Sequence, residues 1–88
     1  LQNNHVTTKE GLLELPRKEV LLLEAMALSN GRVVSKSKLL DAMYGIGTDA
    51  DEKVVEVYVS RLRKRLKHYG IEIKMQRGIG YKLQVTEL

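Results

Sequence analysis

The segment 52–66 constrains the fold most strongly, because its apolar residues repeat with the period of an α-helix. Four of them fall within a narrow sector of one helix face: Val55, Val59, Leu62 and Leu66. The opposite face carries basic and small side chains together with Val57, and either Asp49 or Asp51 can cap the helix. We therefore expect a fold in which this helix buries one face and exposes the other.

The positive charge of the chain is concentrated in the same helix. The 88 residues carry a formal net charge of +4. The segment 52–67 contains six Lys or Arg residues and two acidic residues, whereas the rest of the chain contains nine of each. One short segment therefore carries the whole excess of positive charge. Such a concentration of charge is suited to a polyanionic partner.

The composition excludes several other kinds of chain. With 43% hydrophobic and 30% charged residues, the sequence is that of a folded globular protein. It contains no cysteine, so disulfides and thiolate metal sites are excluded. Apolar runs such as 20–23 are far too short to span a membrane, and no signal peptide is visible. Because the first residue is not Met, we expect that the sequence is part of a longer chain.

Turn residues and periodicity predict the N-terminal half of the fold. The segment 6–15 is predicted to form a hairpin that turns at Gly11. A helix is predicted over 16–29, with Asn30 and Gly31 ending it and with Val20, Leu21, Leu23, Ala27 and Leu28 at helical spacing. A short extended link then leads to Ser35, which is predicted to cap a second helix over 36–44.

The C-terminal residues predict a second hairpin. Apolar residues alternate in 71–76 and again in 81–85, which is the period of a strand. The turn 77–80 between them contains two glycines. The order of hairpin, three helices and hairpin indicates an α+β domain that occupies residues 1–88.

Three helices followed by a hairpin form a winged helix-turn-helix, and this arrangement suits DNA. The major groove of B-form DNA is about wide enough for one helix. A helix that buries one face can enter the groove with its basic face, while the hairpin reaches the neighbouring minor groove. Double-stranded DNA is therefore the favoured partner.

The sequence resembles the effector domain of the OmpR/PhoB family of response regulators over nearly its whole length. The segment 55–66 is similar to the recognition-helix signature V-[DE]-V-x-[IV]-x-x-L-R-x-K/R-L, and 77–83 is similar to the wing signature R-G-x-G-Y-x-L. The segments 18–23 and 31–40 are similar to the first two helices. The resemblance implies a winged helix-turn-helix with a short N-terminal antiparallel β-sheet, three helices and a C-terminal β-hairpin wing. It also implies sequence-specific DNA binding that regulates transcription.

The resemblance and the helix geometry together predict which residues contact DNA. The helix 52–67 is expected in the major groove, with four candidates for base contacts: Val57, Ser60, Arg61 and Lys64. An arginine can bond the O6 and N7 atoms of guanine, and a valine can contact a thymine methyl group. The candidates for contact with the DNA backbone are Lys36, Lys53, Tyr58 and Arg63. The wing 76–81 is expected at the minor groove through Arg77, Gly78 and Tyr81.

Three of these residues also have a structural interpretation. Arg63 lies beside the buried stripe and could pair with Glu56 instead of a phosphate. Tyr81 fits the core of the hairpin better than a ligand contact. For Tyr58, which flanks the buried stripe, partial packing is the default and a phosphate contact is the alternative.

The resemblance also implies partners. The loop 44–51 resembles the segment with which the family can contact RNA polymerase, and it comprises Tyr44, Gly45, Ile46, Gly47, Thr48, Asp49, Ala50 and Asp51. The family resemblance implies an upstream receiver domain phosphorylated on an aspartate by a sensor kinase, a second copy on tandem half-sites, a cytoplasmic location and no membrane partner.

No enzymatic role is expected from the sequence. His5 and His68 do not belong to a ligand-spaced cluster, and no serine lies in a nucleophile elbow. We therefore expect no metal, no cofactor and no catalytic residue. The rival to DNA binding is a protein-interaction module whose basic helix docks an acidic partner. Steep salt dependence and competition by heparin would favour DNA.

Overall fold

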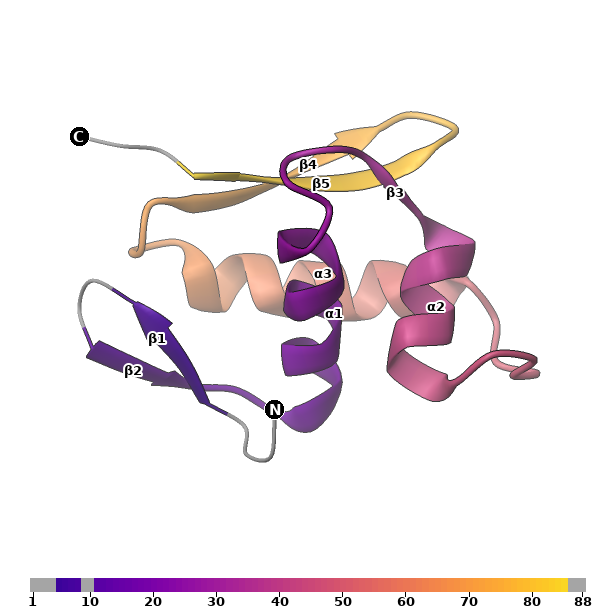
Figure 1. The fold of residues 1–88 in the computed structure, drawn as a ribbon, viewed down its shortest axis with the longest axis horizontal. Helices are drawn as coiled ribbons and strands as arrows, with labels where there is room; N and C mark the ends of the chain where they lie inside the picture. The colour runs from indigo at the N-terminus through magenta and orange to yellow at the C-terminus, as the bar shows by residue number, and fades with distance from the viewer. Residues whose placement is uncertain (1–4, 9–10, 86–88) are drawn as a thin grey trace.

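The structure, a computed structural model, describes residues 5–8 and 11–85. Its elements follow one another as β1 (His5–Thr8), β2 (Gly11–Glu14), α1 (Arg17–Ala27), β3 (Val34–Ser35), α2 (Lys36–Tyr44), α3 (Lys53–Leu66), β4 (Ile71–Gln76) and β5 (Gly80–Val85). Figure 1 shows the β4–β5 hairpin along one side of the helices and the β1–β2 hairpin near the start of α1. This arrangement confirms the predicted winged helix-turn-helix.

Helix α1 is shorter than predicted. Pro16 precedes its first residue, and the carbonyl oxygen of Pro16 accepts hydrogen bonds from the amides of Glu19 and Val20. The helix ends at Ala27 rather than at 29, because the amides of Ser29 and Asn30 bond three residues back and the chain reverses at Asn30 and Gly31. Both of these residues have positive φ, at 54° and 84°.

The buried face of α1 also differs from the predicted one. Its buried residues are Glu19, Val20, Leu22, Leu23 and Met26. Ala27 is exposed, and Leu28 is 78% exposed in the turn that follows, although both matched the predicted spacing. The true stripe includes a carboxylate, which a search for apolar residues alone does not select.

Side chains accept hydrogen bonds from backbone amides at the starts of both other helices. The Ser35 hydroxyl accepts a hydrogen bond from the Lys38 amide at 3.1 Å, which confirms the predicted cap of α2. Before α3 the carboxylate of Asp51 accepts from the Lys53 amide at 2.9 Å. Of the two candidates, Asp51 is therefore the one that bonds the start of α3, although it stands one residue before the N-cap position, Glu52. None of the described helices is long and apolar enough to cross a membrane.

The wing belongs to a sheet of three strands in the order β3-β5-β4. The short link between α1 and α2, which was expected only to be extended, forms β3. In it Val34 pairs with Tyr81 and Ser35 pairs with Gly80. A Cβ atom at Gly80 would overlap the carbonyl oxygen of Val34. The close approach of the two backbones therefore requires glycine at this position.

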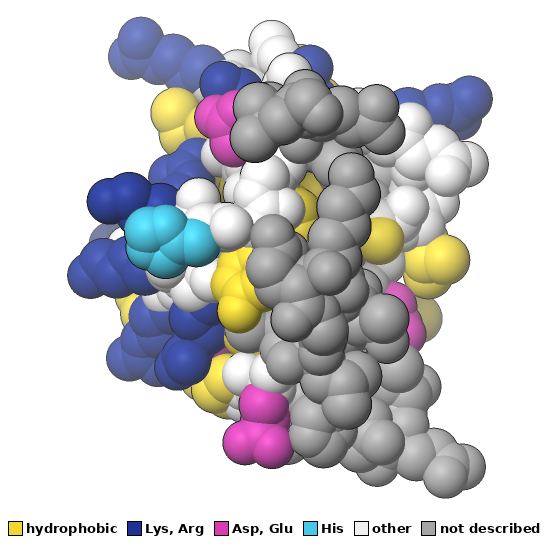
Figure 2. Space-filling view, turned by 90° about the vertical axis from the view of Figure 1, so that its left-hand side faces the viewer, with side chains coloured by type: hydrophobic (Ala, Val, Ile, Leu, Met, Phe, Trp, Pro, Cys, Tyr) yellow, Lys and Arg dark blue, Asp and Glu magenta, His cyan; other side chains and the backbone are white. Residues whose placement is uncertain are grey.

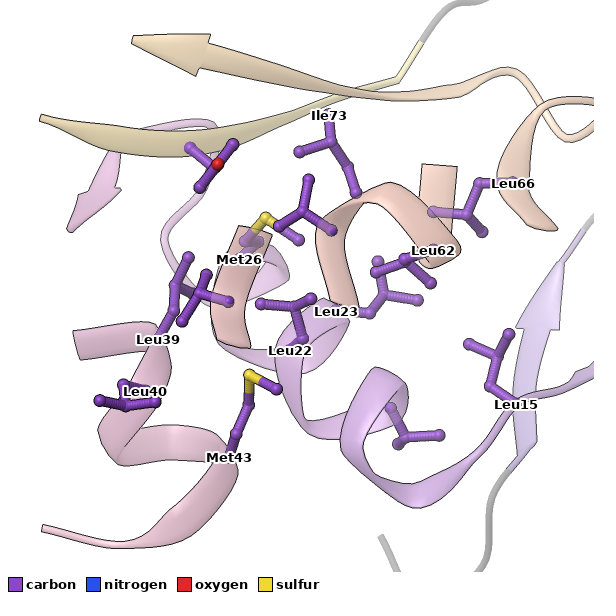
Figure 3. Packing of buried hydrophobic residues seen from close by; sticks show 14 residues of the cluster. Leu15, Leu22, Leu23, Met26, Leu39, Leu40, Met43, Leu62, Leu66 and Ile73 are labelled. Carbon is purple, nitrogen blue, oxygen red and sulfur yellow. The ribbon is translucent and has the colours of Figure 1, made fainter. Parts of the chain in front are cut away.

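The core lies where the three helices and the wing meet (Figure 3). All four apolar residues that were predicted to face inward from α3 are buried. They pack with residues from every other helix and from the wing, and the whole cluster comprises Leu15, Val20, Leu22, Leu23, Met26, Leu39, Leu40, Met43, Val55, Val59, Leu62, Leu66, Ile73 and Tyr81. The inner face of α3 is thus fixed, and its outer face is left for solvent.

An ion pair joins α1 to α3 at the edge of the core. The side chain of Glu19 is only 1% exposed, and its Oε1 atom lies 2.8 Å from Nε of Arg65. The contact is an ion pair without the geometry of a hydrogen bond. It compensates a buried carboxylate, which would otherwise be costly to desolvate.

Candidate DNA-binding surface

The outer face of α3 presents all four candidates for base contacts to solvent: Val57, Ser60, Arg61 and Lys64. Val57 is 48% exposed, whereas the other face of the same helix supplies the core. Lys53, in the first turn, is exposed as well. Figure 2 shows Lys and Arg side chains gathered along one side of the molecule. The structure therefore combines the predicted positive face with one exposed apolar residue.

Lys36 joins this surface from α2. Its Nζ atom donates to Oε2 of Glu56 on α3 at 2.9 Å. The hydrogen bond to Glu56 is the main cause that raises the pKa of Lys36 above its ordinary value of 10.5. Lys36 therefore lies at the predicted DNA surface as a protonated side chain at neutral pH, with an acidic neighbour.

Arg63 makes structural contacts with the wing and not the expected alternative, a pair with Glu56. Its Nε and Nη2 atoms both donate to the carbonyl oxygen of Ile73, at 3.1 and 2.9 Å. Its guanidinium carbon lies 5.9 Å from the ring centroid of Tyr81. Tyr81 itself is buried, as the core interpretation required. Arg63 therefore ties α3 to the wing.

The tip of the wing is exposed beside the start of α2. Arg77 and Gly78 are both exposed, and Gly78 has a φ of 78°, which the turn requires. A hollow of about 280 Å³ separates the wing from the beginnings of α2 and α3, and it is lined by Ser35, Lys36, Ser37, Glu52, Met75, Gln76, Gly78, Ile79 and Gly80. The wing tip, Lys36 and the first turn of α3 thus border one surface.

The loop 44–51 leaves α2 at the far end from that hollow. Ile46 is 94% exposed, and Gly45 and Gly47 both have positive φ. Thr48 is half-buried, and its hydroxyl accepts a hydrogen bond from the Ala50 amide at 3.1 Å. The loop therefore has an internal hydrogen bond and an exposed apolar tip.

The sequence did not predict the contacts that surround Tyr44. Lys18, on α1, donates from Nζ to the carbonyl oxygen of Met43 at 2.8 Å and lies 4.0 Å from the ring centroid of Tyr44. Burial, followed by the proximity of Tyr58, raises the pKa of Tyr44. These residues are far apart in sequence, and no periodic pattern relates them.

The fold and this surface define the chain as a winged-helix DNA-binding domain. Residues 5–83 match the family described as "Transcriptional regulatory protein, C terminal". The chain belongs to this family, and it is of the OmpR/PhoB type that supplies the DNA-binding part of two-component response regulators.

Named relatives agree with this assignment. The chain is 44% identical over 68 residues to the phosphate regulon transcriptional regulatory protein PhoB of Rhizobium meliloti, covering 75% of this chain and 30% of that protein. It is 34% identical over 84 residues to the sensory transduction protein RegX3 of Mycobacterium leprae, covering 91% of this chain and 42% of that protein. The chain therefore spans less than half the length of these relatives.

A solved structure shows the same fold on DNA. The DNA-binding domain of RstA from Klebsiella pneumoniae, in complex with the RstA box, matches with a TM-score of 0.72 and 28% identity. The match covers 89% of this chain and 80% of that one. The domain type to which this chain belongs thus regulates transcription by binding DNA.

Proposed function

We propose that the chain binds double-stranded DNA sequence-specifically, with α3 in the major groove and the wing 76–81 at the minor groove. The observation that carries this proposal is the division of α3 into a buried apolar face and an exposed face with Val57, Arg61 and Lys64. An arginine in the groove can bond guanine bidentately, and Val57 can contact a thymine methyl group. Ser60 and Lys64 lie on the same exposed face and supply further polar contacts.

Other residues fix the domain on the DNA backbone. Lys53 and Lys36 flank the exposed face of α3 and are suited to phosphates by charge and position. Arg77 at the wing tip is suited to the minor groove, where narrow A·T-rich stretches have enhanced negative potential. Tyr58 remains a candidate for a phosphate contact, whereas the contacts of Arg63 and Tyr81 favour structural roles.

Binding-site selection with the wild-type chain and two variants tests these roles. Arg61→Ala should flatten the base preference at one or two positions of the DNA site. It should also reduce the binding free energy by about 1–3 kcal/mol, mostly on the selected site. Arg77→Ala should instead relax a preference for A·T-rich flanks. If Arg61→Ala keeps the wild-type motif and loses affinity evenly over all sequences, Arg61 is a phosphate clamp and the assignment is wrong.

A salt titration tests the backbone contacts. Lys53→Ala should weaken binding to selected and random duplexes alike and reduce the salt slope by about one unit. Arg17→Ala, an exposed residue at the start of α1 outside the proposed DNA-binding surface, is the matched control and should leave the slope unchanged. Weak salt dependence and no competition by heparin in the wild-type chain would favour the rival, an acidic protein partner.

The whole protein is proposed to contain more than this domain. Because the relatives are longer, we propose an upstream receiver domain that a sensor kinase phosphorylates, and a cytoplasmic location. Two copies would bind tandem half-sites. The loop 44–51 would contact RNA polymerase, and the exposed Ile46 at its tip supports a protein contact there.

A further inference from the structure

Arg61, the proposed base-reading residue, is held by an aromatic ring. Its guanidinium carbon lies 5.3 Å from the ring centroid of Tyr58, one helical turn earlier in α3. Residues three apart on a helix are neighbours on its surface. An arginine within about 6 Å of an aromatic centroid is attracted by the ring. The ring therefore restricts a long side chain that would otherwise sample many rotamers.

Tyr58 is itself fixed, which a positioning residue must be. Its ring is half-buried and packs against the hydrophobic core. Its phenol is close enough to Tyr44 to contribute, after burial, to the raised pKa of Tyr44. Lys18 holds Tyr44 in turn, with Nζ 4.0 Å from the ring centroid and a hydrogen bond to the preceding carbonyl. The ring against Arg61 is thus held by its packing against the core.

We infer that Tyr58 is a positioning residue that preorganises Arg61 for base reading, and that its packing against the core holds its ring in place. The inference rests on the proposed function, because it assumes that Arg61 reads a base. Holding the side chain in one conformation before binding reduces the entropy lost on binding. The effect should therefore appear as sequence preference and not as general affinity for DNA.

A double-mutant cycle tests this role. Tyr58→Leu keeps an apolar side chain but removes the ring, and Tyr58→Phe keeps the ring. Affinity is measured on the selected duplex and on one with the base pair assigned to Arg61 replaced. Tyr58→Leu should reduce the ratio of the two affinities by about two- to fivefold, as expected for an exposed cation–π contact. Tyr58→Phe should preserve the ratio, and Tyr58→Leu should change nothing further in an Arg61→Ala background.

Proton NMR of the free chain provides a readout that is independent of DNA. The ring current of Tyr58 should shift the side-chain protons of Arg61, and the shift should persist in Tyr58→Phe and vanish in Tyr58→Leu. Tyr69→Leu, beyond the end of α3, is the control for loss of a half-buried tyrosine. Thermal unfolding of each variant verifies that it is folded.

Three results would overturn the inference, and they are distinguishable. If Tyr58→Leu weakens both duplexes equally, and does so in the Arg61→Ala background as well, Tyr58 contacts DNA itself. If Arg61→Ala leaves the preference unchanged, the proposed function fails at Arg61 and the inference fails with it. An unaltered Arg61 spectrum in Tyr58→Leu would also contradict the stacking on which the inference depends.

Discussion

Lys36 and Glu56 face each other between α2 and α3, with 2.9 Å between Nζ and Oε2. Both residues lie at the proposed DNA surface, and one of them is negatively charged. The pair therefore places an acidic group where phosphates are expected to approach. The pairing with Lys36 reduces the repulsion between Glu56 and phosphate. It also engages the ammonium group of Lys36, which could otherwise bind a phosphate.

We predict that Glu56→Gln tightens DNA binding. The change removes one negative charge at the surface and frees Lys36, so affinity should rise for selected and random duplexes alike. The salt dependence should become steeper by up to about one unit. Glu24→Gln, on α1, is the matched control and should have little effect. Weaker binding by Glu56→Gln would show that the carboxylate contributes a contact of its own.

The Lys36–Glu56 pair also determines the pH at which DNA binding by the Glu56→Gln variant should be measured. The pKa of Lys36 is raised above 10.5, chiefly by its hydrogen bond to Glu56. Its contribution to stability is therefore fully present below pH 10.5 and is lost only as the pH rises through the raised pKa. Fluorescence anisotropy at neutral pH thus compares variants in which Lys36 keeps its charge.

We predict that Arg63→Ala destabilises the fold. Its guanidinium makes two hydrogen bonds to the carbonyl oxygen of Ile73, and hydrogen bonds to charged groups contribute about 1.5–3 kcal/mol. Denaturant unfolding should show a loss of about 1–3 kcal/mol, since the group is partly exposed. Lys64→Ala, one residue later and outward, should change the free energy of unfolding by less than about 0.5 kcal/mol. Equal stability of the two variants would instead favour a DNA contact for Arg63.

We predict that Gly80→Ala is more damaging than Gly78→Ala, although both glycines belong to the wing. At Gly80 a Cβ atom would overlap the backbone of Val34, so the strands must separate, which costs about 3 kcal/mol. At Gly78 there is open space, and only the positive φ opposes a side chain, at about 1 kcal/mol. Calorimetric melting compares the two variants, and a reversed order would contradict the close approach.

We predict that Ile46→Asp separates DNA binding from transcription. Ile46 is almost fully exposed, so the change should spare the fold and the affinity measured by gel shift. If the loop 44–51 contacts RNA polymerase, transcription in vitro should fall. Leu28→Asp alters another exposed apolar residue and should leave both properties intact. A parallel loss of DNA affinity in Ile46→Asp would contradict the separation. Thr48 is a poorer probe, because its hydroxyl stabilises the loop.

The sequence predicted α3 well because one physical rule governs it. Each apolar residue at its helical spacing is buried, and the residues between them are exposed apart from the half-buried Tyr58. Met75 shows the limit of such a rule, since alternation placed it with Ile71 and Ile73. It is nevertheless 59% exposed, because β4 extends beyond the core toward the wing tip. Periodicity specifies a side of an element, but not whether another element covers it.

Contacts between distant residues could not be predicted in the same way. Residues 20 positions apart form the pair Lys36–Glu56, and Arg63 bonds a backbone carbonyl that has no sequence signature. The pairing of β3 with β5 was also not predicted, because a strand of two residues shows no alternation. These features depend on how the elements pack, whereas the pattern of one segment reports only on that segment.

The pairing of Ser35 with Gly80 has a consequence for the shape of DNA that the domain can accept. It attaches the wing to the residue that caps α2, and the close backbone contact leaves little room for the wing to pivot. Arg63, on α3, bonds β4, which is the other strand of the wing. The angle between α3 and the wing is thus set within the protein. In the proposed mode of binding, a duplex whose twist shifts one groove relative to the other would have to deform to satisfy both contacts, so we expect the domain to respond to helical phase as well as to base sequence.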